Sequence, residues 1–79
     1  MDDTIKQALL QKLTELSLEA KIADRLYDLD YSEDNRSEFI KTRAKVRGFL
    51  TALYLIPEIS LGEIEKAENT FKVTIEKTV

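Results

Sequence analysis

The stretch DLDYSEDNRSEF, residues 28–39, decides how the chain folds, because it separates two long segments with helical periodicity. Ser32 is a good helix N-cap, since its hydroxyl can accept a hydrogen bond from a free backbone amide of the first turn. Glu33 and Asp34 would then lie in that first turn, where the positive end of the helix dipole favours acids. A short connection also places consecutive helices side by side. The stretch therefore predicts a tight turn between two antiparallel helices.

The same stretch is similar to the first half of a calcium-binding EF-hand loop. Oxygen-bearing side chains recur at every second position, at Asp28, Asp30, Ser32 and Asp34. An EF-hand loop also needs a glycine at its sixth position for the sharp turn and a bidentate glutamate at its twelfth. Those two positions hold Glu33 and Phe39, so the ligand that closes the coordination shell is missing. We therefore expect a turn and not a calcium site, and we predict no metal and no cofactor.

The segment before the turn, about residues 3–29, predicts a long helix. Its main apolar seam follows a spacing of threes and fours, at Ile5, Leu9, Leu13, Leu16, Ala20, Ala23 and Tyr27. Asp2 and Asp3 can cap the start of this helix and suit the positive end of its dipole. The spacing is close to the repeat of a helix that packs along a second helix.

The segment after the turn, about residues 33–56, predicts the second helix of the hairpin. Its seam also has helical spacing, at Phe39, Val46, Phe49, Leu53 and Ile56. Pro57 ends it, because the residue before a proline is disfavoured in helical geometry. In the antiparallel register Leu13 of the first helix would face Leu53 of the second.

A shorter third helix is predicted at about residues 60–69. Ser60 and Glu63 match a capping box, in which each side chain accepts a hydrogen bond from the other residue's backbone amide. The stretch TFKVTIE, residues 70–76, alternates apolar and polar side chains, which favours a strand, although a helix is also compatible with its apolar spacing. We expect an extended or frayed C-terminal tail there. The whole chain, residues 1–79, is thus expected to form one all-α domain.

Composition excludes several classes of protein. The 79 residues include no Cys and no His, so disulfides and thiolate or imidazole zinc sites are excluded. Fifteen acids against 12 Lys and Arg give a net charge of −3, which provides no whole-protein attraction to nucleic acid or to anionic lipid. No apolar run approaches the ~20 residues of a membrane span, and the N-terminal residues lack the basic region of a signal peptide. We expect a cytoplasmic protein that does not enter a membrane.

A second apolar row on the first helix predicts an interface. It lies largely opposite the main seam and consists of Leu18, Ile22, Leu26 and Leu29. The third helix could cover this row, but ten residues of helix span only about 15 Å and begin at the other end of the hairpin. A chain this short is also only marginally stable alone. We therefore expect the row to be covered by another chain, most simply in a homodimer.

Two charged regions are further candidates for contacts. The acidic turn could contact a basic partner through Asp28, Asp30, Glu33, Asp34 and Glu38. The second helix carries basic residues that could contact a nucleic-acid backbone, namely Arg36, Lys41, Arg43, Lys45 and Arg47. We expect the arginines instead to meet acids of the first helix: in the antiparallel register Arg47 comes near Glu19, and Arg43 comes near Glu19 or Asp24.

Catalysis finds no support in the sequence. No serine lies in a nucleophile motif, the two glycines are isolated, and the carboxylates belong to solvated helix faces where nothing raises a pKa for acid–base work. We predict no catalytic residues and no enzyme.

The charged hairpin followed by RGFLTALYLIPEISLGEIEKA, residues 47–67, resembles in general style the small accessory proteins of bacteria and their phages. That resemblance rests on no specific motif and assigns no residue a role. Our expectation is a non-enzymatic protein-interaction module, such as a regulator, inhibitor or adaptor, that acts as a homo-oligomer and binds another protein. The alternative is a nucleic-acid-binding accessory protein.

Overall fold

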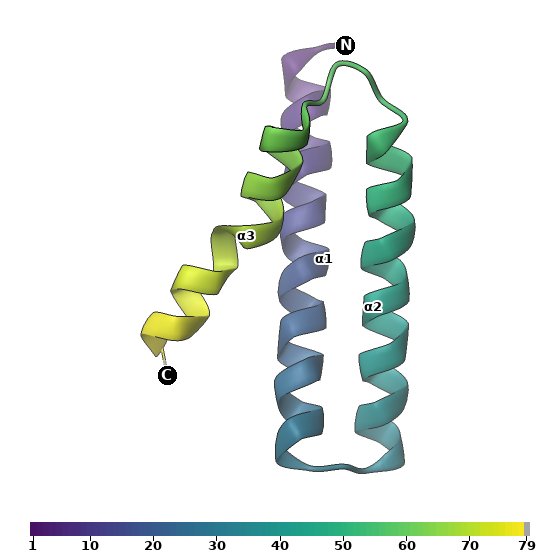
Figure 1. Cartoon of the computed structure of the whole chain (residues 1–79), viewed down its shortest axis with the longest axis vertical. Coiled ribbons are helices and arrows are strands. Elements are labelled where there is room, and N and C mark those ends of the chain that lie inside the picture. The colour runs from purple at the N-terminus through teal and green to yellow at the C-terminus, as the bar shows by residue number, and fades with distance from the viewer. Residues whose placement is uncertain (79) are drawn as a thin grey trace.

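The computed structural model describes the backbone of residues 1–78 and the side chains of residues 1–69. Within these residues the chain forms three helices and no strand: α1 (Asp3–Leu29), α2 (Glu33–Tyr54) and α3 (Leu61–Thr78). Figure 1 shows α1 and α2 as a long antiparallel hairpin, with α3 starting beside the N-terminal end of α1. The predicted all-α hairpin with a third helix is confirmed.

The end of α3 differs from the expectation. The helix continues to Thr78, where we expected an extended or frayed tail from about residue 69. A helix satisfies its backbone hydrogen bonds within itself, whereas a single strand needs a neighbour, and residues 1–69 contain no other strand. The side chains of residues 70–79 and the backbone of Val79 lie outside the described part of the chain.

Local capping fixes where each helix begins. The Asp2 carboxylate accepts a hydrogen bond from the Thr4 amide at 2.9 Å, and Ser32 Oγ accepts one from the Asn35 amide at 3.2 Å. At the start of α3, Ser60 Oγ accepts from the Glu63 amide, and the Glu63 carboxylate accepts from the Ser60 amide. The three predicted N-terminal caps are therefore confirmed.

Asn35 holds the turn of the hairpin closed. Its side-chain amide donates to the backbone oxygen of Asp30 at 3.0 Å and to that of Leu26 at 3.3 Å. Leu26 lies in the last turn of α1, and Asp30 is the C-cap, whose backbone amide also donates to the Leu26 oxygen. The Asn35 amide in the first turn of α2 thus satisfies the Asp30 carbonyl and is a second donor to that of Leu26.

The hydrophobic core lies where the three helices meet, away from the turn. Its buried members come from both hairpin helices, α3 and the connection before α3: Leu10, Leu13, Leu53, Ile59, Ile64 and Ala67. Leu13, Leu53 and Ile64 are almost completely buried. Leu13 and Leu53 were expected to face each other, and they belong to the same cluster. Ile5, expected in the seam, is 54% exposed, because α2 ends at Tyr54 and does not extend past it.

α3 packs mainly on α1 and has little contact with α2. The Thr14 hydroxyl donates to the backbone oxygen of Ala67 at 3.0 Å, and Lys6 Nζ lies 2.8 Å from Glu63 Oε2.

Near the turn the hairpin consists of two helices only. There Tyr27 packs against Phe39, with ring centroids 5.4 Å apart.

Truncating the core should destabilise the fold strongly. Leu13→Ala removes a completely buried side chain, and such substitutions lower the free energy of unfolding by about 2–5 kcal/mol. This is a large share of the roughly 5–15 kcal/mol of a typical domain. The control is Leu55→Ala, because Leu55 is 80% exposed. Urea unfolding should show a large loss for the first variant and about 0.5 kcal/mol or less for the second. Equal losses would show that the core is misplaced.

Glu63 should make the stability depend on pH. The hydrogen bond from Lys6, followed by those from Ser60, holds the pKa of Glu63 below its ordinary value of 4.5. A carboxyl group with a lowered pKa in the folded state stabilises the fold above its unfolded-state pKa. This contribution is lost as the pH falls through the lower, folded-state pKa. Glu63→Gln should therefore weaken the acid sensitivity of the thermal midpoint measured from roughly pH 3 to pH 6. Glu65→Gln, on the exposed side of α3, should retain it.

Candidate interaction surfaces

The second apolar row of α1 is exposed in the structure. The exposed fractions are 37% for Leu18, 50% for Ile22, 49% for Leu26 and 76% for Leu29. Spacings of four, four and three residues place these side chains on one side of α1. α1 meets α2 through another side, where Leu13, Leu16 and Ala23 are buried. α1 therefore has two apolar faces, and only one of them is covered by the hairpin.

The described side chains of α3, up to residue 69, make their contacts away from this row. Their contacts with α1 lie nearer the N-terminus of α1, at Lys6 and Thr14. The alternative that the third helix folds over the row is thus not what these described side chains show. Leu29 and the adjacent Tyr31 are both 76% exposed, so the apolar surface continues to the turn.

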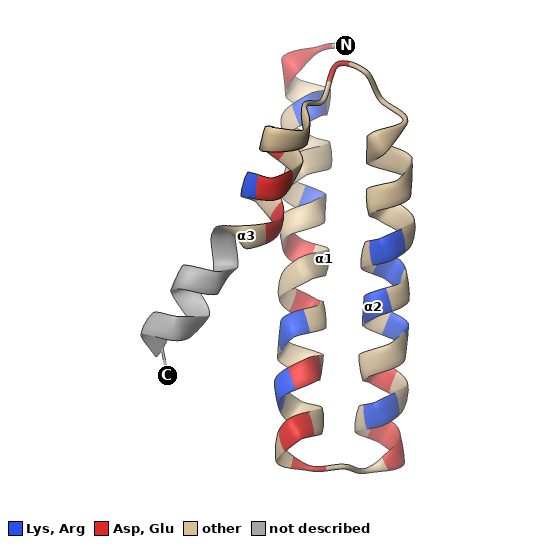
Figure 2. Ribbon diagram, viewed as in Figure 1, with Lys and Arg blue, Asp and Glu red and all other residues tan. Residues whose placement is uncertain are grey.

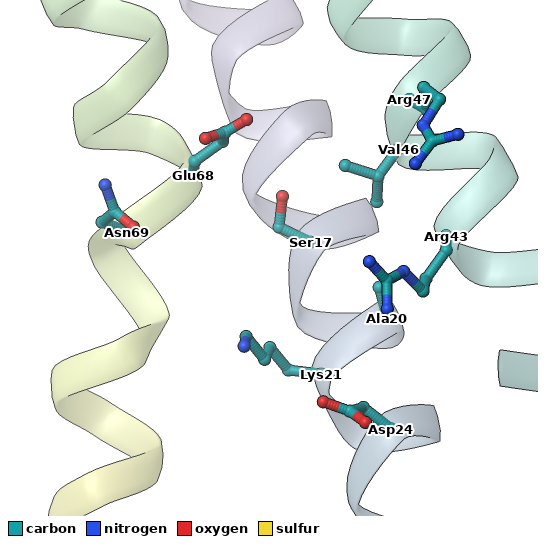
Figure 3. A pocket seen from close by; sticks show the side chains of 9 residues that line it. All are labelled: Ser17, Ala20, Lys21, Asp24, Arg43, Val46, Arg47, Glu68 and Asn69. Carbon is teal, nitrogen blue, oxygen red and sulfur yellow. The ribbon is translucent and has the colours of Figure 1, made fainter.

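The basic residues of α2 do not form one continuous surface. Arg43 and Arg47 line an open groove of about 360 Å³ between the three helices, whereas Arg36, Lys41 and Lys45 do not. Figure 3 shows the groove with α1 between the other two helices. Arg43 also lies over the ring of Phe39, with its guanidinium carbon 5.1 Å from the ring centroid, which is a cation–π contact.

The groove contains charges of both signs. Its charged side chains are Lys21, Asp24, Arg43, Arg47 and Glu68. The ion pairs expected for Arg43 and Arg47 do not form: among the described side chains neither lies within 4.0 Å of Glu19 or Asp24. Asp24 lines the same groove as the two arginines. Glu19 does not line the groove, because it lies on another side of α1.

Ser17 is a groove residue that sequence reasoning missed. The residue is only 5% exposed, and its hydroxyl has no hydrogen-bond partner in the structure. Glu68 and Asn69 of α3 were also missed as groove residues. No local signal could have identified the three together, because they meet only through the direction in which α3 crosses α1.

The acidic turn forms one end of the molecule. Figure 2 shows acidic residues concentrated there, and basic residues along the middle of α2. All five predicted contact residues are exposed: Asp28, Asp30, Glu33, Asp34 and Glu38. Within the described residues no group of three or more acidic, His or Cys side chains could hold a metal ion. The turn therefore presents separate carboxylates to the solvent.

Within the described part of the chain, no helix combines the length and the apolar character that crossing a bilayer requires. Comparison with known proteins found no matching family model, no matching curated protein and no matching solved structure.

Proposed function

We propose that this chain is a small non-enzymatic interaction protein that forms a homodimer and binds another protein, as a regulator, inhibitor or adaptor in the cytoplasm. The observation that carries the proposal is the exposed apolar row of α1, Leu18, Ile22, Leu26 and Leu29. Contiguous apolar rows on a protein surface mark sites of association. A helix in a simple hairpin needs only one apolar face, and the second face of α1 is exposed in the monomer.

The energetics support association through this row. Complete burial of a Leu or Ile side chain contributes roughly 1.5–3 kcal/mol relative to leaving it exposed. Ile22 and Leu26 each remain about half exposed, and Leu29 is more exposed still. The monomer is small, so its own core is limited, and a second chain adds buried apolar surface where the hairpin lacks a third helix. Association would therefore stabilise the less supported end of the hairpin.

The acidic turn supports contact with a basic partner. Its carboxylates are exposed and lie next to the apolar row, because Leu29 adjoins Asp28 and Asp30 in the chain. Acidic surfaces steer the approach of positively charged partners and select against negatively charged ones. The turn and the row together form one end of the molecule with both charge and apolar area.

The alternative, nucleic-acid binding, has one observation in its favour. Arg43 and Arg47 form no ion pair with a described side chain, so no carboxylate competes with a phosphate for their guanidinium groups, although that of Arg43 lies over the ring of Phe39. Two observations favour the protein partner: Asp24 and Glu68 line the same groove, and the chain carries a net charge of −3. Both oppose the accumulation of a polyanion.

Self-association is tested by sedimentation velocity at high micromolar concentration. The wild-type chain should sediment as a dimer, and the double variant Leu18→Glu, Ile22→Glu as a monomer with unchanged helicity in circular dichroism. The control Leu55→Glu changes a residue that is 80% exposed at the other end of the hairpin and should leave the dimer intact. A wild-type chain that remains monomeric at these concentrations would refute the proposal.

The nucleic-acid alternative is tested by titrating DNA and RNA at two salt concentrations. Phosphate contacts give an affinity that falls steeply with salt. We expect weak binding, changed little by the double variant Arg43→Ala, Arg47→Ala. Tight, salt-sensitive binding that this variant abolishes would favour the alternative instead.

A further inference from the structure

We propose that the two α1 helices of the dimer lie parallel, so that both acidic turns are at the same end of the assembly. This inference rests on the proposed function, since it concerns the same apolar row of α1. It rests on the charged residues beside the row, because the sign of the charge differs between the two sides of the row.

The flanking charges follow from helical geometry. At 3.6 residues per turn each residue is rotated about 100° from the one before it. Glu19 therefore lies on one side of the line through Leu18, Ile22, Leu26 and Leu29. Lys21 and Arg25 lie on the other side. All three charged residues are exposed, and none forms an ion pair with a described side chain. Asp28 is also exposed and lies on the same side as Lys21, seven residues further along the helix. One flank therefore carries Glu19, and the other carries Lys21, Arg25 and Asp28, with a net charge of opposite sign; these are called the acidic and the basic flank.

An antiparallel pair would place like charges together. A twofold axis perpendicular to the two helices brings each flank of the row against its own copy, in every register. With the apolar rows superposed, Lys21 of one chain would then lie between Arg25 and Asp28 of the other, nearer to Arg25 along the axis. On the acidic flank, Glu19 would approach Asp30 of the second copy. Like charges held side by side at an interface oppose association.

A parallel pair places opposite charges together. A twofold axis parallel to the helices brings the acidic flank of one α1 against the basic flank of the other. Glu19 then lies about two residues, roughly 3 Å along the axis, from Lys21 of the second copy. Arg25 of that copy is about 9 Å away along the axis, within reach of its long side chain. The pair contains each of these contacts twice.

Glu15 favours the same orientation. It precedes the apolar row on the same face of α1, and its carboxylate lies 4.0 Å from the Lys12 ammonium. In the parallel pair Glu15 faces its own copy, and Lys12 in each chain offsets the repulsion. In the antiparallel pair Glu15 would approach the acidic turn of the second copy, where Asp30, Glu33 and Asp34 are exposed. This contact opposes the antiparallel arrangement, whereas the parallel arrangement places the two acidic turns at one end of the dimer.

Cysteine cross-linking distinguishes the two orientations, and it is clean because the chain has no cysteine. Two single variants are made, Leu18→Cys and Leu29→Cys, which lie about 16 Å apart along α1. In a parallel pair each position meets its own copy, so each variant alone should form a disulfide-linked dimer on mild oxidation. A disulfide needs Cα atoms within about 7 Å. The control Leu55→Cys lies outside the row and is more exposed than either test position, and it should not cross-link efficiently.

The outcomes separate this inference from the proposed function. If only the mixture of the two variants cross-links, through residue 18 of one chain and residue 29 of the other, the helices are antiparallel. The dimer would then stand, and the parallel arrangement would be overturned. If sedimentation shows a dimer, but neither the single cysteine variants nor their mixture form a disulfide-linked dimer, the row is not the interface. If sedimentation shows a monomer, both proposals are refuted.

A charge exchange provides a second measurement. Glu19→Lys should raise the dimer dissociation constant roughly threefold to tenfold, because it places like charges together on both sides of the pair. Adding Lys21→Glu and Arg25→Glu to the same chain restores opposite charges and should recover most of the affinity. In an antiparallel pair Glu19→Lys would instead relieve the repulsion from Asp30, so this single variant would not raise the dissociation constant. A triple variant as weak as Glu19→Lys alone would count against the parallel pair.

Discussion

The packing of Leu13, Leu53 and Ile64 at the junction of the three helices is the contact on which the rest of the structure depends. These side chains are almost completely buried, and each comes from a different helix. Because α3 packs mainly on the N-terminal part of α1, the three-helix core exists at one end of the hairpin only. The other end has two helices, small seam residues such as Ala23, and an aromatic contact between Tyr27 and Phe39. The unequal ends explain why α1 has an apolar face that the monomer leaves uncovered.

Features encoded by neighbouring residues could be predicted from the sequence. The periodic seams gave α1 and α2 nearly their observed bounds, and Ser32 and Ser60 cap the helices where expected. Features that depend on the spatial relation of two helices were less predictable. The exposure of Ile5 depends on where α2 ends. Whether Arg43 and Arg47 form ion pairs with described acids of α1, which they do not, depends on how the hairpin helices are rotated about their axes. Periodicity shows that a helix has a face, but it does not fix what lies opposite that face.

The candidate surfaces also differ in how well the sequence predicts them. The apolar row was predicted from spacing, which uses only the periodicity of a helix. Its exposure was predicted from a third helix of about ten residues, whereas α3 extends to Thr78, so the short length assumed for the third helix is not the reason for the exposure. The groove between the helices could not be predicted, since Ser17, Arg47 and Glu68 belong to three different helices. A surface on one helix can therefore be predicted from its sequence, whereas a site shared by several helices can be predicted only when their packing angles are known.

The parallel arrangement of α1 connects the apolar row to the acidic turn. In such a dimer the two turns lie at the same end, where their carboxylates repel each other, although salt limits this repulsion to distances of about 10 Å. A basic partner that contacts both turns would remove the repulsion, so its binding and dimer formation would strengthen each other. This coupling is reciprocal, because a ligand that stabilises an assembly binds it more tightly than it binds the separate subunits. Self-association through Ile22 and its neighbours and recognition through Asp30 and its neighbours would then be two parts of one equilibrium. An antiparallel dimer would separate the turns and give each an independent binding site.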